Sequence, residues 1–319
     1  MTLPRITVVG SYATGLTMKV KRLPTTGETL LGSGYRVDCG GKGSNQAVGC
    51  ARLGAQVSFV ATIGKDAFGE MALALYRDEG IDTANVRQVE GAPTGVGFIV
   101  VEEASGNNCI VIDPGANELL GADDIGARVA AFAASSVVLT QLEIPVAAAE
   151  AAMQMGRKAG AITILNPAPV RALPTAVLQA IDVLTPNQGE AKVLTGRSPD
   201  AAVEPELVAR ELIRSGVKQV VMTLGEKGAL IVTDAATSVH VPAVAMPAVD
   251  TTGAGDAFNA GLATALASGC DLETAVQFAV VVGGLAVTKE GVIPSLPSRD
   301  EVREFYRQSG RAAPDWLAR

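Results

Sequence analysis

The 319-residue sequence contains one histidine, four cysteines and only 4% aromatic residues. Since His240 is the only histidine, neither a histidine-based catalytic triad nor a histidine-rich metal cluster can form. The four cysteines lie far apart without paired spacing: Cys39, Cys50, Cys109 and Cys270. This spacing excludes a zinc site and a disulfide framework, and it favours a reducing compartment.

The sequence also lacks a stretch of one charge and a long apolar run. Acidic and basic residues are mixed at a net charge of −7, which argues against nucleic acid or an anionic membrane as a partner. The most apolar stretch, 275–287, is interrupted by Gln277 and Gly283. It is shorter than the roughly 20 residues that span a bilayer. The first ten residues lack the layout of a signal peptide, so we expect a soluble, cytoplasmic protein.

Small and β-branched residues are abundant, as is typical of a parallel sheet buried on both faces. Short runs such as Ile6–Val9 and Val57–Ile63 alternate with amphipathic stretches such as Asn45–Leu53. This alternation predicts repeated βαβ units, an α/β fold and a mainly parallel sheet.

Two segments, 13–38 and 95–113, break this pattern because they look extended, carry turn signals and contain no helix. Within the second, Thr94–Val101 and Cys109–Asp113 form a predicted hairpin. We therefore expect a small antiparallel β flap from these two segments, beside an α/β core made of residues 1–12, 39–94 and 114–319.

The most informative motif is Val249–Phe258, which leads into the helical pattern Asn259–Ala267. Its Gly253-Ala254-Gly255 turn would expose backbone N–H groups at the positive end of a helix dipole, which suits a phosphoryl group. Asp256 could then accept a proton from a nearby hydroxyl. A plain helix cap explains the same residues, since Asp is favoured at helix starts.

A second glycine-rich motif, Cys39–Ala47, also opens a helix. Its glycines would let a ligand approach the backbone, and Lys42 and Asn45 would offer hydrogen-bond donors. The spacing fits neither a P-loop nor a dinucleotide-binding fingerprint, and a structural glycine turn remains the alternative.

Two further motifs follow predicted strands, where open α/β sheets bind nucleotides. One is Thr223–Gly228, for which an ordinary turn between strands is the alternative. The other is Thr185–Glu190, in which Asn187 could contact phosphate and Glu190 could organise magnesium through water. An exposed polar helix start explains this motif equally well.

In this order and spacing the four motifs resemble the ribokinase branch of the PfkB carbohydrate kinase family. The resemblance runs from Val8 to Ser295 and includes Leu23–Thr29, Gln141–Glu143 and Asn166–Pro169. It implies a three-layer α/β/α core, a β-sheet lid over the sugar, and often a homodimer packed lid to lid.

The resemblance also implies an ATP-dependent phosphotransferase that phosphorylates the hydroxymethyl group of a sugar or sugar-like acceptor. Asp256 would be the general base, and Gly253, Ala254 and Gly255 the anion hole. Phosphoryl transfer depends mostly on such positioning and charge stabilisation. The acceptor site would comprise Gly41, Lys42, Gly43, Asn45 and Glu143. ATP would be held by Asn187, Thr223, Leu224, Gly225, Glu226, Lys227, Gly228 and Gly255.

Two cations belong to this resemblance. Glu190 would lie near Mg²⁺, and a monovalent cation, K⁺, would be held largely by backbone oxygens. The matching positions for K⁺ are Asp250, Thr252, Ala286, Lys289, Gly291 and Ser295. The alternative is that Asp250 merely braces its loop.

One departure from the family pattern concerns the acceptor. Ribokinases carry an Asn and, two residues later, an Asp that grip sugar hydroxyls after the first strand; here Ala13 and Gly15 stand there. A charged hydrogen bond contributes about 1.5–3 kcal/mol, so this loss predicts an acceptor other than D-ribose, with Tyr12, Thr14 or Thr17 as substitute contacts.

Two alternative functions remain open at this stage. A nucleoside kinase of the same superfamily would need an aromatic platform, and the sequence offers Tyr12, Tyr35, Phe59 and Phe98 near the flap. A sugar-binding sensor without catalysis would have no need of Asp256.

Overall fold

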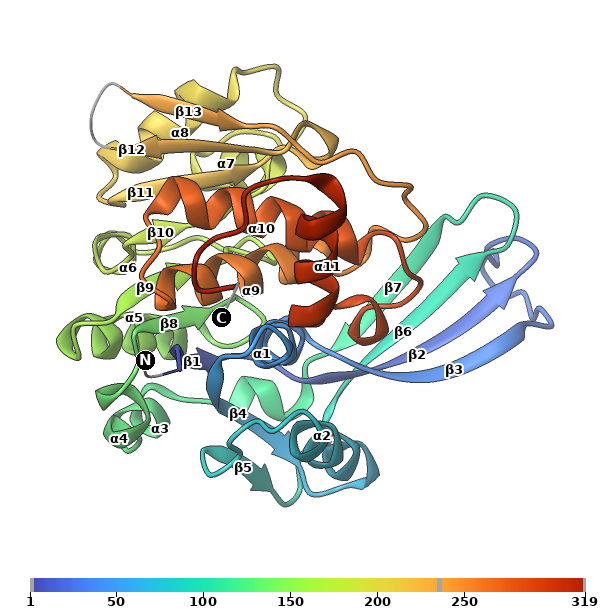
Figure 1. Ribbon diagram of the computed structural model, residues 1–319. Coiled ribbons are helices and arrows are strands. Elements are labelled where there is room, and N and C mark those ends of the chain that lie inside the picture. Colours follow the sequence, from blue (N-terminus) through green and yellow to red (C-terminus); the bar gives the residue numbers. More distant parts are fainter. Residues whose placement is uncertain (1–2, 234–236, 318–319) are drawn as a thin grey trace.

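A nine-stranded sheet forms the centre of the protein in the computed structural model, which describes residues 3–233 and 237–317 (Figure 1). The ends of the predicted core, residues 1–2 and 318–319, lie outside the described residues, as do 234–236. In sheet order the strands are β13 (Ser238–Val241), β12 (Ala229–Thr233), β11 (Gln219–Thr223), β10 (Val183–Leu184), β9 (Ile162–Leu165), β8 (Val137–Thr140), β1 (Arg5–Val9), β4 (Gln56–Gly64) and β5 (Val86–Val89). All neighbours pair in parallel except β11–β12 and β12–β13, so the predicted mainly parallel sheet is confirmed.

Helices cover both faces of this sheet. One core cluster includes residues of α1 (Lys42–Arg52), α2 (Ala67–Asp78), α9 (Ala254–Ala267), α10 (Leu272–Ala286) and α11 (Arg299–Ser309). A second includes residues of α3 (Ala122–Gly126), α4 (Val129–Ala133), α5 (Val146–Lys158), α6 (Thr175–Gln179), α7 (Gln188–Leu194) and α8 (Pro205–Arg214). Short 3-10 turns are η1 (Gly115–Leu119), η2 (Gly225–Lys227) and η3 (Ile293–Ser295).

Strand alternation assigns each side chain to one of the two cores. Val8 is buried in the first cluster and Val9 in the second, and Val137 and Val138 divide in the same way. Since successive strand residues point to opposite faces, a sheet with two covered faces needs apolar residues at consecutive positions, as the sequence has.

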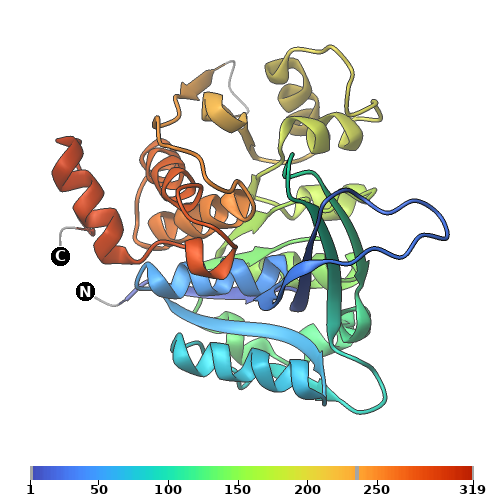
Figure 2. The same ribbon diagram turned by 90° about the vertical axis from the view of Figure 1, so that its right-hand side faces the viewer.

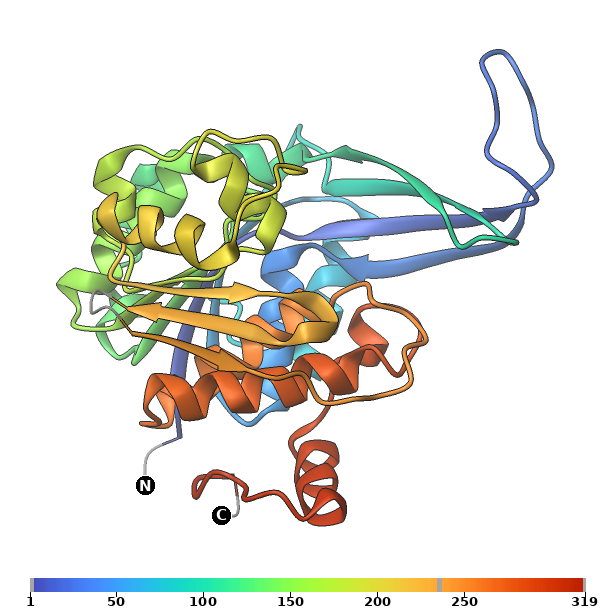
Figure 3. The same cartoon turned by 90° about the horizontal axis from the view of Figure 1, so that it is seen from above.

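The second sheet projects from one side of the core (Figures 1 and 3). Its order is β3 (Ser33–Gly40), β2 (Ala13–Val20), β6 (Gly95–Glu102) and β7 (Asn108–Asp113). The predicted hairpin is present, because β6 and β7 pair antiparallel. The connection between β2 and β3 extends furthest from the core (Figures 2 and 3).

The expectation of an antiparallel flap is wrong at the centre of this sheet, where β2 and β6 pair in parallel along their whole length. Each strand is the first of a hairpin that leaves the core, β2 directly after β1 and β6 after β5. Because both first strands leave the core in the same direction, they run parallel where they pair.

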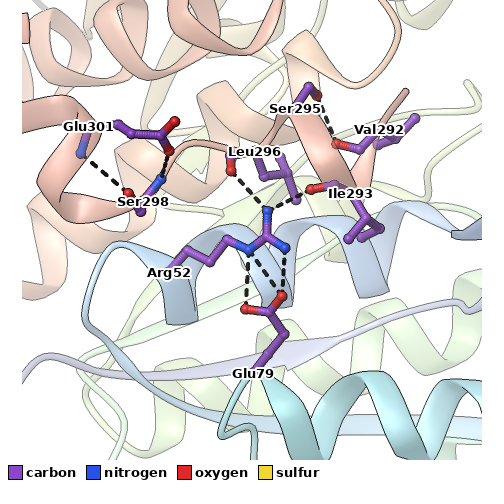
Figure 4. A network of polar contacts seen from close by, with 8 residues as sticks. All are labelled: Arg52, Glu79, Val292, Ile293, Ser295, Leu296, Ser298 and Glu301. Atoms are coloured by element: carbon purple, nitrogen blue, oxygen red, sulfur yellow. Dashed lines mark hydrogen bonds and ion pairs between the residues drawn. The ribbon is translucent and has the colours of Figure 1, made fainter. Parts of the chain in front are cut away.

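Arg52, at the end of α1, joins three segments of the core (Figure 4). Its Nε donates to both carboxylate oxygens of Glu79, at 3.0 and 3.1 Å, and its Nη2 donates to Oε1 at 2.6 Å. Its Nη1 donates to the carbonyls of Ile293 and Leu296 at 2.6 and 3.0 Å. Arg52 therefore fixes the segment around η3 against α1 and the end of α2.

No helix within residues 3–233 and 237–317 is both long and apolar enough to pass through a membrane.

Replacing Arg52 by alanine leaves Glu79 and two carbonyls without their partner. Hydrogen bonds to charged groups contribute about 1.5–3 kcal/mol, so we expect Arg52→Ala to lower the free energy of unfolding by about 2 kcal/mol in urea denaturation. Arg307→Ala, which removes an exposed pair with Glu304, is the control and should change stability little. Equal stabilities of both variants would contradict this role of Arg52.

Candidate active site

A pocket lies where α9 begins, beside the carboxyl ends of β9, β10 and β11. Motifs far apart in the sequence contribute to it. Its lining consists of Lys42, Asn166, Ala168, Thr185, Asn187, Glu190, Thr223, Gly253, Gly255, Asp256 and Asn259. Seven of these were site predictions: Lys42, Asn187, Glu190, Thr223, Gly253, Gly255 and Asp256. Asn166, Ala168, Thr185 and Asn259 were not.

Asp256 is the buried carboxylate of this pocket, with 6% of the residue exposed. Its Oδ2 accepts a hydrogen bond from Asn45 Nδ2 at 2.8 Å, and its Oδ1 accepts one from Gln46 Nε2 at 2.9 Å. Two neutral amides therefore hold the carboxylate without neutralising it. A carboxylate so oriented can accept a proton from a hydroxyl in the pocket.

Lys42 supplies the positive charge. The Asp256 carboxylate raises the pKa of Lys42 above its ordinary value, with smaller contributions from Glu143 and Glu190 and against the opposing effect of burial. Lys42 is therefore protonated at neutral pH. An ammonium group in this place can stabilise negative charge on a transferring phosphoryl group.

Gln46 is a site residue that the sequence reasoning missed. Besides contacting Asp256, its Nε2 lies 3.3 Å from Asn166 Oδ1, and its Oε1 accepts from Gln141 Nε2 at 2.5 Å. The available signal was helical spacing: Lys42 and Gln46 are four residues apart and share a face of α1 with Asn45.

The turn before α1 is held to the start of the chain by very close packing. The Lys42 backbone N–H donates to Glu143 Oε2 at 2.8 Å, and Ser11 Oγ donates to the same oxygen at 2.6 Å. A Cβ on Gly43 would lie 2.4 Å from Ser11 N, and Gly41 has a φ of 88°. Glu143, predicted to contact the acceptor, fixes this turn in the structure.

The predicted anion hole opens α9. Gly253 is the N-cap, with a φ of 81°, and a Cβ there would lie 2.6 Å from Val292 Cγ1. The Ala254 N–H points to the carbonyl of Thr251 at 3.3 Å, so it has a local partner. The next N–H groups along α9 are those without an intrahelical acceptor, and they lie at Gly255 and Asp256.

The predicted nucleotide residues divide into two groups. Asn187 and Thr223 line the pocket, and their backbones form an isolated parallel bridge. Gly225–Lys227 instead form η2, with Leu224 N donating to Gly228 O at 2.8 Å. Leu224, Gly225, Glu226, Lys227 and Gly228 form the turn between β11 and β12 outside the pocket lining.

Glu190 forms a capping box with Asn187, in which each side chain accepts from the other's backbone N–H at 2.8 Å. Burial, and to a smaller extent the Asp256 charge, raises the pKa of Glu190 despite the Asn187 bond and the Lys42 charge. A carboxylate whose charge is poorly compensated is suited to a cation or its bound water.

Asp250 bridges two loops beside the anion hole. Its Oδ1 accepts from Thr252 N at 2.9 Å, and its Oδ2 accepts from Gly291 N at 3.0 Å. Burial alone would raise its pKa, but these hydrogen bonds and the charge of Arg36 leave the pKa lower than usual. Asp250 therefore joins the start of α9 to the loop at Gly291.

The other predicted cation ligands lie on either side of that loop. Ala286 ends α10, and Ser295 Oγ donates to the Val292 carbonyl at 2.8 Å. The Lys289 ammonium is paired with Glu301, so only its backbone could contribute. Within 3–233 and 237–317 no three His, Cys, Asp or Glu side chains cluster as a metal site.

A buried carboxylate and a lysine lie at a helix start, in a pocket at the carboxyl ends of parallel strands. This arrangement is typical of phosphotransferases. The family model described as pfkB family carbohydrate kinase matches residues 3–299. A ribokinase of Haemophilus influenzae is 38% identical over 307 residues, which cover 95% of this chain and 99% of that protein. A deoxyribokinase of Salmonella typhi is 35% identical, with 94% and 98% covered.

Solved structures agree. A structure of Arabidopsis thaliana ribokinase complexed with ribose and ATP has a TM-score of 0.87 at 33% identity, covering 95% of this chain and 98% of that one. The structure of the ribokinase of Giardia lamblia has a TM-score of 0.88 at 31% identity, covering 97% of this chain and 100% of that one. The chain belongs to the pfkB family of carbohydrate kinases. It is an ATP-dependent, ribokinase-like sugar kinase.

The contacts of Gln46 predict a measurable role in turnover. Gln46→Met keeps the volume but removes one of the two donors to Asp256, and a hydrogen bond to a charged group contributes about 1.5–3 kcal/mol. We expect kcat to fall about 10- to 100-fold with little change in the KM for ATP, measured by ADP release. Gln154→Ala, which removes an exposed bond to Glu150, is the control. A wild-type kcat for Gln46→Met would show that Asn45 alone positions Asp256.

Proposed function

We propose that this protein transfers the γ-phosphoryl group of ATP to the hydroxymethyl group of a sugar or sugar-like acceptor, with Asp256 as general base. The observation that carries the proposal is the Asp256 carboxylate, held by Asn45 and Gln46 in one pocket with Lys42 and Asn187. Gly41, Lys42, Gly43, Asn45 and Glu143 line or shape the acceptor side. Asn187 and Thr223 contact ATP, with the Leu224–Gly228 turn beside them.

The reaction is a direct displacement. The acceptor hydroxyl gives its proton to the Asp256 carboxylate, and its oxygen forms a bond to the γ-phosphorus as the bond from phosphorus to the bridging oxygen breaks. ADP leaves with that electron pair. The backbone N–H groups of Gly255 and Asp256 and the Lys42 ammonium stabilise the negative charge of the transferring group.

Magnesium bound to the ATP phosphates would neutralise their charge, and Glu190 would hold it through water. One carboxylate is enough for such a site, because Mg²⁺ usually retains several waters and is bound partly by substrate phosphates. We also propose a K⁺ site at Asp250, Thr252, Ala286, Lys289, Gly291 and Ser295. At the end of α10 the Ala286 carbonyl accepts from Lys289 N at 3.4 Å, which leaves it a second lone pair for a cation. The lowered pKa keeps Asp250 ionised.

The four-stranded sheet would serve as a lid over the acceptor, formed by segments 13–38 and 95–113 beside a core of 1–12, 39–94 and 114–319. The β2 hairpin starts next to the α1 turn, since a Cβ on Gly41 would lie 2.7 Å from Ala13 N. The β6 hairpin starts beside it, because Gly95 pairs with Ala13. The reaction needs ATP, and the four cysteines are unpaired thiols, so we place it in the cytoplasm.

The nucleoside kinase alternative is less well supported by the aromatic residues. Tyr12 and Phe59 are fully buried in the core, so neither offers a platform for a base. Phe98 is 55% exposed but adjoins Gly97 in β6, and neighbouring strand residues point to opposite faces. Gly97 pairs with Gly15, which lies on the same face as Asp38. Phe98 therefore lies on the opposite face of the sheet, away from Asp38, and does not offer a platform on the Asp38 face.

Asp256→Asn tests the catalytic proposal. A general base contributes about 10²- to 10⁴-fold, so we expect kcat to fall by at least about 100-fold while ATP binding and the thermal unfolding temperature change little. ADP release is measured with Mg²⁺ and ATP, with and without K⁺, across pentoses, deoxypentoses, hexoses, polyols and nucleosides. Asp271→Asn, at the N-cap of α10 outside the pocket lining, is the control.

Each outcome of this screen has a distinct meaning. Turnover of sugars that Asp256→Asn abolishes supports the kinase, and turnover of nucleosides alone would favour the nucleoside kinase. Ligand binding without ADP release in the wild-type protein would favour a sensor. Equal rates with and without K⁺ would contradict the K⁺ site.

We further propose a homodimer formed through the outer face of the lid, defined by Met18, Tyr35, Phe98 and Val111. These side chains are 40–68% exposed, and pairing places Phe98 opposite Val111. Burying them in a second copy would remove apolar surface from water. We expect sedimentation velocity to show a dimer for the wild-type protein and a monomer for Phe98→Asp. A monomeric wild-type protein would contradict this proposal.

A further inference from the structure

The inner face of the lid is defined here by Gly15, Asp38, Gly97 and Ile99, and it contains an open position at Gly15. Gly15 does not have a positive φ. A Cβ built there would meet only Ile99 Cδ1 at 3.5 Å and the Asp38 carbonyl at 3.7 Å, both ordinary contacts. The absence of a side chain at this position is therefore imposed neither by backbone strain nor by lack of space.

A carboxylate stands directly across the strand pair from this open position. Gly15 of β2 is paired with Asp38 of β3 in an antiparallel register. Directly opposite residues of an antiparallel pair share a face, with Cβ atoms about 4.5–5.5 Å apart. Asp38 thus projects on the face where Gly15 offers no side chain, and its side chain is 49% exposed.

This face is turned toward the catalytic loops. Arg36, two residues before Asp38 on the same strand, donates from Nη1 to Glu290 Oε1 at 2.8 Å. Glu290 immediately precedes Gly291, whose N–H donates to Asp250 beside the start of α9. At its other end β3 runs into Gly41 and the α1 turn.

The charge pattern makes Asp38 the available acceptor on this face. Arg36 Nε lies 3.6 Å from Asp38 Oδ2, and the Arg36 guanidinium also pairs with Glu290. Arg36 is therefore engaged with two carboxylates, which disfavours an anionic acceptor as its ligand. Asp38 lies beyond hydrogen-bond distance from Arg36 at this ion pair, and its oxygens can accept hydrogen bonds from hydroxyls.

We propose that Asp38 is a specificity-determining residue that accepts a hydrogen bond from an acceptor hydroxyl other than the one phosphorylated. The carboxylate reaches the acceptor from β3, across from the empty Gly15 position of β2, and Arg36 orients it. This inference rests on the proposed function, because it places the acceptor between the lid and Asp256. The Asp38 carboxylate would supply the affinity for polyhydroxylated acceptors, D-ribose included, that Ala13 and Gly15 do not supply.

Asp38→Asn tests this with D-ribose and 2-deoxy-D-ribose as acceptors. Loss of one charged hydrogen bond corresponds to about a 10- to 100-fold rise in the KM for D-ribose. We expect kcat, the KM for ATP and the thermal unfolding temperature to change little. Glu103→Gln is the matched control, since this carboxylate lies directly after β6 and accepts from Ser33 Oγ of β3 at 2.8 Å.

Moving the carboxylate from position 38 to position 15 distinguishes two roles of Asp38, binding of the acceptor and support of Arg36. The double variant Gly15→Asp, Asp38→Ala returns the carboxylate to β2 in the same space, so it should recover most of the affinity that Asp38→Ala loses. If the rise in KM caused by Asp38→Asn disappears with 2-deoxy-D-ribose or 3-deoxy-D-ribose as acceptor, the missing hydroxyl is the one that Asp38 contacts. If Arg36→Gln raises the KM as much as Asp38→Asn, and the double variant recovers nothing, Asp38 only holds Arg36 and the inference falls.

Failure of the inference is distinguishable from failure of the proposed function. Wild-type turnover with an unchanged KM in Asp38→Asn would overturn the role of Asp38 and leave the kinase intact. Calorimetric binding of D-ribose that depends on Asp38, without any ADP release, would overturn the kinase and leave the inference intact. Neither binding nor turnover of any of the three sugars would contradict both.

Discussion

The contact between α1 and α9 at Asp256 is the constraint on which the rest of the site depends. Asn45 and Gln46 reach a carboxylate more than 200 residues away in the sequence, at 211 and 210 residues respectively. A buried charge is costly unless it is paired and hydrogen-bonded. Here two amides orient it and the Lys42 ammonium supplies positive charge nearby, so the carboxylate is fixed in position. Any displacement of either helix would leave that charge without its partners.

Close backbone packing keeps these two helices in place. Gly43 lies against Ser11 and Gly253 against Val292, each at a distance that no side chain would permit. Glu143 holds the α1 turn through Ser11 and the Lys42 N–H, while Arg52 holds the opposite end of α1 to the η3 segment. The glycines of the two motifs therefore serve the geometry of the pocket as well as the approach of a ligand.

The two faces of the four-stranded sheet carry different side chains. Strand alternation turns Gly15 and Asp38 inward, and it turns Phe98 and Val111 outward. The two faces of this sheet thus differ, with the Asp38 carboxylate on one and exposed apolar side chains on the other. Because β2 follows β1 and β3 runs into α1, this sheet is joined directly to the turn that carries Lys42.

The sequence by itself determined the α/β class, the β6–β7 hairpin and the residues that open α1, α7 and α9. These features rest on local signals, namely hydrophobic periodicity, turn residues and helix starts, which act within a few positions. The membership in a kinase family followed because four such motifs occur in one order. Only the tertiary structure decided that Gln46 contacts Asp256, that β2 pairs in parallel with β6, and that Asp38 stands opposite Gly15. These three features depend on strand register or on hydrogen bonds between distant segments. The spacing of neighbouring residues encodes neither the register nor the long-range hydrogen bonds.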